Sequence, residues 1–509
     1  MQYEAVIGLE VHAELATQSK MFCACRVVDT TQAAPNSAVC QVCSGMPGTL
    51  PVLNQKAVEY GLRVALALDC QIATLSIFAR KNYFYPDLPK GYQISQYEQP
   101  LARNGRMTIV SSQGEKVIRI RRVHLEEDTG KLTHVEPVGV GLAPAQDDRK
   151  AQGDRKGRPY TLVDLNRAGV PLLEIVTEPD FRSSEEVRAY AEGLRSILRY
   201  LGVNSGDMQK GVLRIEPNIS LRPAVAAGLQ PAPLGTRVEV KNLNSFRALE
   251  RAVAYQIQRQ AELLEAGKAV QQVTLGWDEA KEVTVVQRVK EGEDDYRYFP
   301  EPDLPPLAVE AGWIAQIRAS LPELPYARFL RLREQYDLSD YTAKLLVEEK
   351  AIADYFEQAV TAEPSLPAKS IANWISGELF GLMNQAGVDA TELKVPPEAL
   401  AGLVNLVSQG QINQDTARKV LAEMFASGEG AEEIVIKRGL GQVSDVEAIA
   451  RMVKAVLAEY PNEAAAYLSG KTGVANFLFG QVMKKAQGKA NPQIVRRELE
   501  LQLTEINAD

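Results

Sequence analysis

The sequence of 509 residues contains only five cysteines and three histidines, and long apolar runs are missing from it. Five cysteines in a chain of this length are too few for a disulfide scaffold, which favours a reducing, cytoplasmic location. No apolar run approaches the ~18 residues that a membrane-spanning helix needs, so we expect no membrane partner. The first residues lack a basic segment followed by an apolar core, and the sequence therefore predicts no secretory signal.

An excess of positive charge is also missing. The chain has 57 lysines and arginines against 65 aspartates and glutamates, a formal net charge of −8. This balance excludes a wholly basic protein that coats nucleic acids, although it allows a local basic surface. The hydrophobic share of 45% is that of an ordinary globular protein. At ~100–200 residues per domain, the length predicts two to four domains.

Four of the five cysteines form two close pairs, Cys23 with Cys25 and Cys40 with Cys43. Two such pairs separated by a loop can place four thiolates tetrahedrally around zinc. Because all four ligands would come from the protein, the site would be closed and structural. The alternative is two unrelated reduced pairs, or a redox pair, and the spacing favours the metal.

The pattern of apolar and polar residues changes after about residue 300. Up to about residue 305 the patterns alternate between strand and helix, and four prolines then follow between residues 300 and 306. Beyond them the periodicity is mostly helical. We therefore expect an α+β fold with an N-terminal domain over residues 1–305, a helical domain over 306–435 and a helical tail over 436–509. Residues 145–158 are expected to form an exposed loop.

Capping patterns predict individual helices. Ser183 followed by Glu186 is a capping box, and we expect the helix that it opens to end at Gly202. A second helix is expected over residues 245–266. In the C-terminal part, Ser444 is predicted to cap an amphipathic helix.

Strand patterns carry most of the charged residues in the first half. The alternation from Tyr3 puts Glu10 and His12 on one face. Two further strands show polar faces with the residues Arg214, Glu216 and Asn218, and Arg237, Glu239 and Lys241. Carboxylates with a histidine suit a divalent cation such as Mg²⁺, and alternating cations and carboxylates suit phosphate chemistry. The alternative is that these are solvated faces of antiparallel strands, which are common.

The sequence lacks an ordinary nucleotide-binding motif. Gly470, Lys471 and Thr472 look like the end of a phosphate-binding loop, but Ala465 stands where that motif requires glycine. The segment also does not follow a strand. Any ATP site would therefore have to be built from the strand faces.

Several long stretches follow one known pattern. Besides the cysteine pairs, they are Val6–His12, Arg80–Gln96, Asp164–Arg167, Val170–Asp180, Lys241–Ser245 and Asp295–Asp303. Together they resemble the B subunits of the bacterial aspartyl/glutamyl-tRNA amidotransferases, and the resemblance covers essentially the whole chain. It implies a cradle-like catalytic domain with an antiparallel sheet and helices, followed by an all-α domain and a helical tail.

The resemblance also implies an activity. Members of this family use ATP and Mg²⁺ to phosphorylate the side-chain carboxylate of Glu-tRNA(Gln) or Asp-tRNA(Asn). Ammonia from a partner amidase (the A subunit) then displaces phosphate, which gives Gln-tRNA(Gln) or Asn-tRNA(Asn). A small third protein (the C subunit) completes a heterotrimer, and zinc at the cysteines is structural.

Site residues follow from the motifs of this family. Matching positions imply a catalytic set of Glu10, His12, Glu127, Glu174, Glu216 and Glu239. All of these except Glu174 are expected to bind Mg²⁺. The implied substrate-binding residues are Lys81, Tyr83, Tyr92, Arg214 and Lys241.

Two positions depart from the family pattern. Lys210 stands where a carboxylate is usual, and Glu216 replaces an aspartate. These departures are the main argument from the sequence for an alternative function, a non-catalytic scaffold that binds tRNA, whereas the long family motifs favour the enzyme. In the tail, residues 471–497 contain six basic and no acidic residues, which suits contacts with tRNA phosphates. The alternative for the tail is a solvated helix face.

Overall fold

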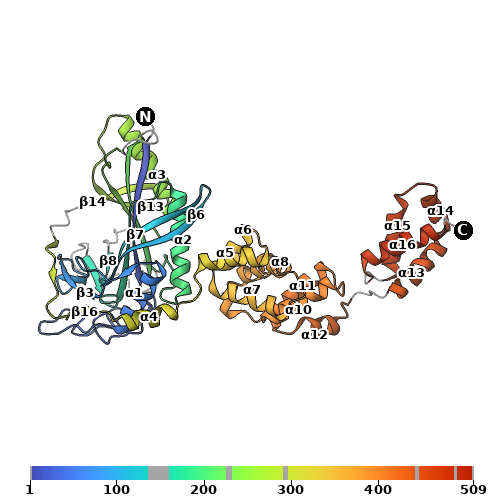
Figure 1. Cartoon of the computed structure of the whole chain (residues 1–509), viewed down its shortest axis with the longest axis horizontal. Helices are drawn as coiled ribbons and strands as arrows, with labels where there is room; N and C mark the ends of the chain where they lie inside the picture. Colours follow the sequence, from blue (N-terminus) through green and yellow to red (C-terminus); the bar gives the residue numbers. More distant parts are fainter. Residues whose placement is uncertain are drawn as a thin grey trace, which may run out of the picture. The chain divides into compact units, whose positions relative to one another are not determined.

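The computed structural model describes residues 3–135, 160–224, 232–289, 296–441, 446–486 and 490–506. The chain forms two compact units, Met1–Tyr326 and Ala327–Asp509. The first unit mixes strands and helices, and the regular elements in the described part of the second unit are all helices (Figure 1). This confirms the α+β fold class. The predicted loop 145–158 lies outside the described residues.

One large sheet forms the frame of the first unit. Its strands are β1 (Tyr3–Glu14), β2 (Gln71–Ile72), β6 (Ala102–Ser111), β7 (Gly114–Glu127), β10 (Pro171–Thr177), β11 (Leu213–Pro223), β12 (Val238–Lys241), β13 (Val273–Asp278) and β14 (Val283–Val289). Their order across the sheet is β14-β13-β12-β11-β1-β10-β7-β6-β2. The neighbours are antiparallel, as predicted, except β12 and β13. That pair is parallel because a helix crosses over between the two strands.

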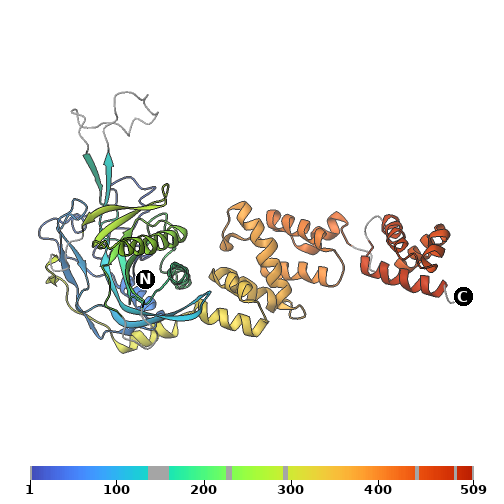
Figure 2. The same ribbon diagram turned by 90° about the horizontal axis from the view of Figure 1, so that it is seen from above.

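Shorter strands complete the first unit. They are β3 (Leu75–Ser76), β4 (Ala79–Asn82), β5 (Tyr92–Ser95), β8 (Lys131–Val135), β9 (Tyr160–Asp164), β15 (Phe299–Pro300) and β16 (Leu307–Ala308). β8 and β9 form a two-stranded ribbon that projects from the unit (Figure 2). β15 pairs with β4, and β16 pairs with β3. The proline-rich segment therefore contributes strands to the first unit. The division into three domains at residues 305 and 435 stays a prediction.

The described residues of the first unit include four α-helices: α1 (Gln55–Ala67), α2 (Ser184–Tyr200), α3 (Phe246–Glu265) and α4 (Ala311–Ala319). The hydroxyl of Ser183 accepts the backbone N–H of Glu186, and Gly202 follows α2 with a φ of +66°. The hydroxyl of Ser245 caps α3 in the same way. Both predicted helices are confirmed, and they pack side by side (Figure 2).

The helices cover one face of the large sheet. On β1, the side chains of Ile7, Leu9 and Val11 are almost completely buried in the core that the helices and the sheet share. Each buried side chain of this size contributes about 1.5–3 kcal/mol to folding. Because side chains alternate along a strand, Glu10 and His12 lie on the opposite face. The apolar pattern of β1 thus decides which residues can form a site.

In the part that the structure describes, the second unit is built from helices around two apolar clusters. Its elements are α5 (Pro325–Tyr336), α6 (Asp340–Val347), α7 (Lys350–Ala362), α8 (Ala368–Trp374), the π-helix η2 (Ile375–Leu379), α9 (Phe380–Ala386), the 3₁₀ helix η3 (Ala390–Glu392), α10 (Pro397–Ser408), α11 (Gln414–Ser427), α12 (Ala431–Arg438), α13 (Val446–Glu459), α14 (Pro461–Leu468), α15 (Val474–Lys485) and α16 (Pro492–Ile506). One cluster spans residues 332–434 and the other spans 449–503. The helix expected after Ser444 exists as α13, while Ser444 itself lies outside the described residues.

None of the helices described is both long and apolar enough to cross a membrane.

Candidate active site and metal centres

The first group of site residues lies where β1, β10 and β7 run side by side. In the antiparallel register His12 lies opposite Glu174, and Glu174 lies opposite His124. His12 Nε2 is 3.5 Å from Glu174 Oε2 and 3.6 Å from Glu126 Oε1. His124 Nε2 is 3.1 Å from Glu174 Oε2. We call His12, His124, Glu126 and Glu174 the histidine cluster.

The charges of this cluster stabilise one another. Burial alone would raise the pKa of Glu174, but the charges and hydrogen bonds of His124 and His12 lower it well below its usual range. Burial alone would lower the pKa of His12, but Glu174 and Glu126 raise it to about 9. Without a metal, His12 therefore holds a proton at a place where a divalent cation can take over the positive charge.

The second group lies on β1, β11 and β12. Glu10 lies opposite Glu216, and Asn218 lies opposite Glu239. Asn218 Nδ2 donates to Glu10 Oε1 at 3.0 Å, and Lys241 Nζ donates to Glu216 Oε2 at 2.7 Å. Burial raises the pKa of Glu10, and so do the charges of Glu174, Glu239 and Glu216. We call Glu10, Glu216 and Glu239 the carboxylate cluster.

Both clusters fit a divalent cation. The ligand atoms of His12, Glu126 and Glu174 all lie within 4.8 Å of one another, and the same holds for the carboxylate cluster. Asn218 Oδ1 is buried and has no hydrogen-bond partner among the described residues, so a further oxygen stands close to Glu10. Oxygen-rich donor sets of this kind suit Mg²⁺.

Two of the predicted site residues, Glu127 and Arg214, form ion pairs outside both clusters. Glu127 forms an ion pair with Lys90 and accepts the backbone N–H of Ile94 at 3.0 Å. Arg214 donates to Asp128 Oδ2 at 2.8 Å. The side chains of Glu127 and Arg214 thus have partners of their own at the ends of β7 and β11.

Two tyrosine rings lie close to Lys81 of β4, one of the predicted substrate-binding residues. Lys81 Nζ is 4.9 Å from the ring centre of Tyr296 and 5.9 Å from that of Tyr83. Burial alone would lower the pKa of Lys81, but Tyr298 and the carboxylates Glu126 and Glu174 raise this pKa. Lys81 therefore lies in the electrostatic field of the histidine cluster. Tyr92 instead packs against the guanidinium of Arg80, at 4.2 Å.

Sequence reasoning missed two members of the histidine cluster, His124 and Glu126. The motif match selected Glu127 from three consecutive acidic residues. A signal for Glu126 was present, because His124 and Glu126 are two residues apart on a strand and must share a face. Glu127, one residue further, must point to the other side.

The four predicted zinc ligands come together. Cys43 Sγ is 3.9 Å from Cys25 Sγ and 3.9 Å from Cys40 Sγ, and all four sulfurs, with that of Cys23, lie within 4.8 Å of one another. A tetrahedron with Zn–S bonds of about 2.3 Å has edges of about 3.8 Å. The donor chemistry and the spacing of the cysteines therefore fit zinc.

Hydrogen bonds join the loop between the cysteine pairs to the segment 163–169. Asn36 N donates to Asp164 Oδ1 at 2.9 Å, and Ala38 N donates to Asn166 Oδ1 at 2.8 Å. Asn166 Nδ2 in turn donates to Ala34 O at 2.7 Å. Because residues 163–169 lead directly into β10, the cysteine loop supports the strand that carries Glu174.

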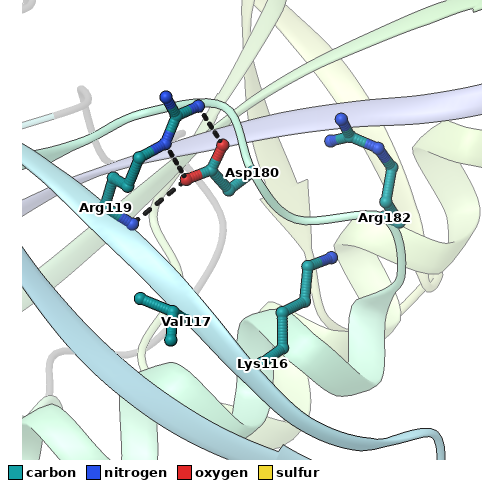
Figure 3. A pocket seen from close by; sticks show the side chains of 5 residues that line it. All are labelled: Lys116, Val117, Arg119, Asp180 and Arg182. Carbon is teal, nitrogen blue, oxygen red and sulfur yellow. Dashed lines mark hydrogen bonds and ion pairs between the residues drawn. The ribbon is translucent and has the colours of Figure 1, made fainter.

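A surface hollow of about 390 Å³ lies away from these groups (Figure 3). It is lined by Lys116, Val117, Arg119, Asp180 and Arg182. Arg119 makes a two-pronged ion pair with Asp180 there, and Lys116 and Arg182 pair with Glu186 and Glu4. No residue of the histidine or carboxylate cluster lines it, so the hollow and the candidate site are separate.

Comparison with known proteins gives the class of the first unit, a catalytic domain. Residues 5–315 match the GatB/GatE catalytic domain, and residues 354–503 match the GatB domain. The B subunit of the aspartyl/glutamyl-tRNA(Asn/Gln) amidotransferase from Moorella thermoacetica is 50% identical over 99% of this chain and 100% of its own length. The proteins of the same name from Thermomicrobium roseum and Dehalococcoides mccartyi are each 48% identical, over 98% and 99% of both chains. The chain belongs to the family of aspartyl/glutamyl-tRNA amidotransferase B subunits.

Proposed function

We propose that this chain is the tRNA-binding and activating subunit of an ATP-dependent amidotransferase. It would convert Glu-tRNA(Gln), Asp-tRNA(Asn) or both to the amidated forms. The observation that carries the proposal is the pair of neighbouring clusters on β1, with Glu10 in one and His12 in the other. The names of the relatives, whose matches cover 98–99% of the chain, support the same reaction.

The chemistry requires activation because a free carboxylate is a poor electrophile. A side-chain carboxylate oxygen of the aminoacyl group attacks the γ-phosphorus of ATP, and the bond from that phosphorus to the leaving ADP oxygen breaks. Ammonia then attacks the carbonyl carbon of the acyl phosphate. Inorganic phosphate leaves with the bonding electrons, the nitrogen loses a proton to solvent or a nearby base, and the amide results. Phosphoryl transfer of this kind is catalysed mainly by positioning and charge.

The two clusters have complementary roles in this proposal. Glu10, Glu216 and Glu239 would hold one Mg²⁺, and His12, Glu126 and Glu174 would hold another. Bound Mg²⁺ supplies charge neutralisation at the phosphates of ATP. Lys241, which donates to Glu216, offsets part of the negative charge of the carboxylate cluster.

The remaining predicted site residues act around these clusters. Lys81, with Tyr83 beside it, presents a positive charge to the substrate carboxylate or to the departing phosphate. Glu127 was expected to bind Mg²⁺; because of its pairing with Lys90, we propose that it positions β5 against β7. Arg214 would hold Asp128 at the end of β7, and Tyr92 would fix the guanidinium of Arg80.

The partners and location follow from the reaction. We propose zinc at the four cysteines and a heterotrimer with an amidase (the A subunit) and a small third protein (the C subunit). We also propose a cytoplasmic location, where aminoacyl-tRNAs are used. The helical part after residue 435, with the basic residues of α15 and α16, would bind the tRNA body.

The test is the release of γ-phosphate from ATP by the full complex with Glu-tRNA(Gln) and Mg²⁺. We expect Glu10→Gln to reduce this release at least 100-fold, because its cluster loses a charge, with tRNA affinity unchanged. Glu115→Gln, on an exposed position of β7, is the matched control and should behave like the wild type. If the wild-type complex releases no phosphate above background, the chain is the non-catalytic scaffold instead.

A further inference from the structure

A buried lysine lies beside the cysteine site. Lys20 is completely buried, although lysines almost always keep their ammonium group in water. Its Nζ lies 3.6 Å from Cys43 Sγ and 3.2 Å from the carbonyl oxygen of Leu165. A buried ammonium needs such partners, because burying an unpaired charge is very costly.

The sulfur that Lys20 reaches differs from the other three. Cys43 is buried, while Cys23, Cys25 and Cys40 are partly exposed. Cys43 Sγ also accepts the backbone N–H of Cys40 at 3.2 Å. Of these four residues Cys43 is the least exposed, and two donors of the protein, Lys20 Nζ and Cys40 N–H, reach its sulfur.

Charge gives the second reason for a lysine here. Four thiolates around one Zn²⁺ carry a net charge of −2, which is unfavourable close to an apolar core. One ammonium offsets half of this charge. Groups that hydrogen-bond to metal ligands set the orientation of the ligand and the affinity of the site.

We propose that Lys20 is a positioning residue of the cysteine site, whose ammonium donates a hydrogen bond to the Cys43 thiolate and offsets the charge of the metal-bound sulfurs. Its second bond, to Leu165 O, joins the site to residues 163–169. The proposal rests on zinc at the four cysteines and is independent of the proposed tRNA reaction.

The surroundings of Lys20 connect the cysteine site with the end of β7. A Cβ atom built on Gly169 would lie 3.5 Å from both Cys43 Cβ and Lys20 Cδ, so the backbone packs directly on the two side chains. Gly169 has a φ of +84°, and its N–H donates to Asp128 O at 2.9 Å. The cysteine site and Lys20 thus pack directly against Gly169, in the loop that precedes β10.

Zinc retention in the full chain tests the proposal. We expect Lys20→Met, which keeps the length of the side chain but removes the charge and the donors, to weaken zinc affinity about 10–100-fold. The measurement is competition with a coloured chelator. In the cobalt-substituted chain, the sulfur-to-metal charge-transfer band of the variant should shift, because Cys43 loses a donor.

Lys210→Met is the matched control. Lys210 Nζ pairs with Asp29 of the same cysteine loop at 3.1 Å, is exposed, and is a lysine of equal charge. It should leave zinc affinity and the cobalt spectrum unchanged. If Lys20→Met also leaves both unchanged, or if Lys210→Met weakens zinc as much, the proposal is overturned.

A measurement on the wild type covers the case in which Lys20→Met does not fold. In the chain loaded with cadmium-113, a hydrogen bond from Lys20 to a metal-bound sulfur should give a scalar coupling between the Nζ protons and cadmium. The absence of this coupling, with the other donor Cys40 N–H showing one, would also overturn the proposal.

Discussion

Glu126 and Glu127 are adjacent in the sequence and both almost completely buried, yet their side chains have different partners. Glu126 faces His12 across the sheet, and Glu127 faces Lys90. Alternation along β7 is sufficient to produce this difference, since neighbouring side chains of a strand point to opposite faces. At the scale of single residues, a position in a motif is therefore a weaker guide than the face on which that position lies.

Substitution of Glu174 and of Glu127 should show that these two carboxylates have different roles. We expect Glu174→Gln to remove one bound Mn²⁺ ion, used as a probe for Mg²⁺, because His12 and Glu126 lose the carboxylate between them. Glu127→Gln should keep both ions but lower the free energy of unfolding by about 1–3 kcal/mol, since Lys90 loses its charged acceptor. Electron paramagnetic resonance counts the bound Mn²⁺, and urea titration gives the stability. Loss of an ion in Glu127→Gln would contradict this assignment.

At the scale of elements, strand order brings the site together. β1 lies between β10 and β11, so its two neighbours supply Glu174 to one cluster and Glu216 to the other. A shift of one residue in either pairing would turn a whole strand over, with its apolar side chains facing solvent. The buried residues Leu9 and Val11 therefore hold the register on which the site depends.

In the second unit, ion pairs join α5 and α7, and they predict that the stability of α7 depends on pH. Arg328 donates to Asp354 Oδ1 at 2.6 Å, and Arg331 donates to Glu357 Oε1 at 2.6 Å. Burial alone would raise the pKa of Glu357, but its bonds to Arg331 and Arg328 lower it. A lowered pKa in the folded state means that the stabilisation is present above the ordinary glutamate pKa of about 4.3 and is lost as the pH falls below it.

We therefore expect Glu357→Gln to open α7 about tenfold more often at neutral pH, a change of about 1.4 kcal/mol. The difference from the wild type should shrink as the pH falls through the lowered pKa of Glu357. Hydrogen exchange of α7 peptides, corrected for the intrinsic effect of pH, measures the opening. Glu432→Gln, on an exposed position of α12, is the control. A difference that does not depend on pH would contradict the ion-pair explanation.

At the scale of the whole molecule, the candidate site and the basic tail belong to different units. Both clusters and the four cysteines lie within the first unit, Met1–Tyr326. The basic residues of α15 and α16 lie in the second unit, around an apolar cluster of their own over residues 449–503. Lys485 is partly neutralised by Glu459, and Arg496 packs over Phe479, so these two cations are already positioned by the fold.

Removal of the residues after 441 tests the role of the tail. We expect a lower tRNA affinity and a smaller dependence of that affinity on salt, because each lost phosphate contact removes about 0.7–0.9 from the slope of log affinity against log salt. Binding of zinc and Mn²⁺ should not change. Filter binding between about 50 and 200 mM salt gives the slope. An unchanged slope would favour the solvated-face interpretation.

The sequence by itself determined the α+β class, helices α2 and α3, the grouping of four cysteines and the family. These features depend on local spacing: caps, alternating side chains, paired cysteines and long contiguous motifs. Only the tertiary structure decided that the predicted carboxylates divide into two clusters, that the strand order brings Glu126 of β7 within reach of His12 of β1, and that Lys20 reaches Cys43. Those contacts join residues far apart in the chain, and they depend on strand register and packing, which the local sequence does not specify.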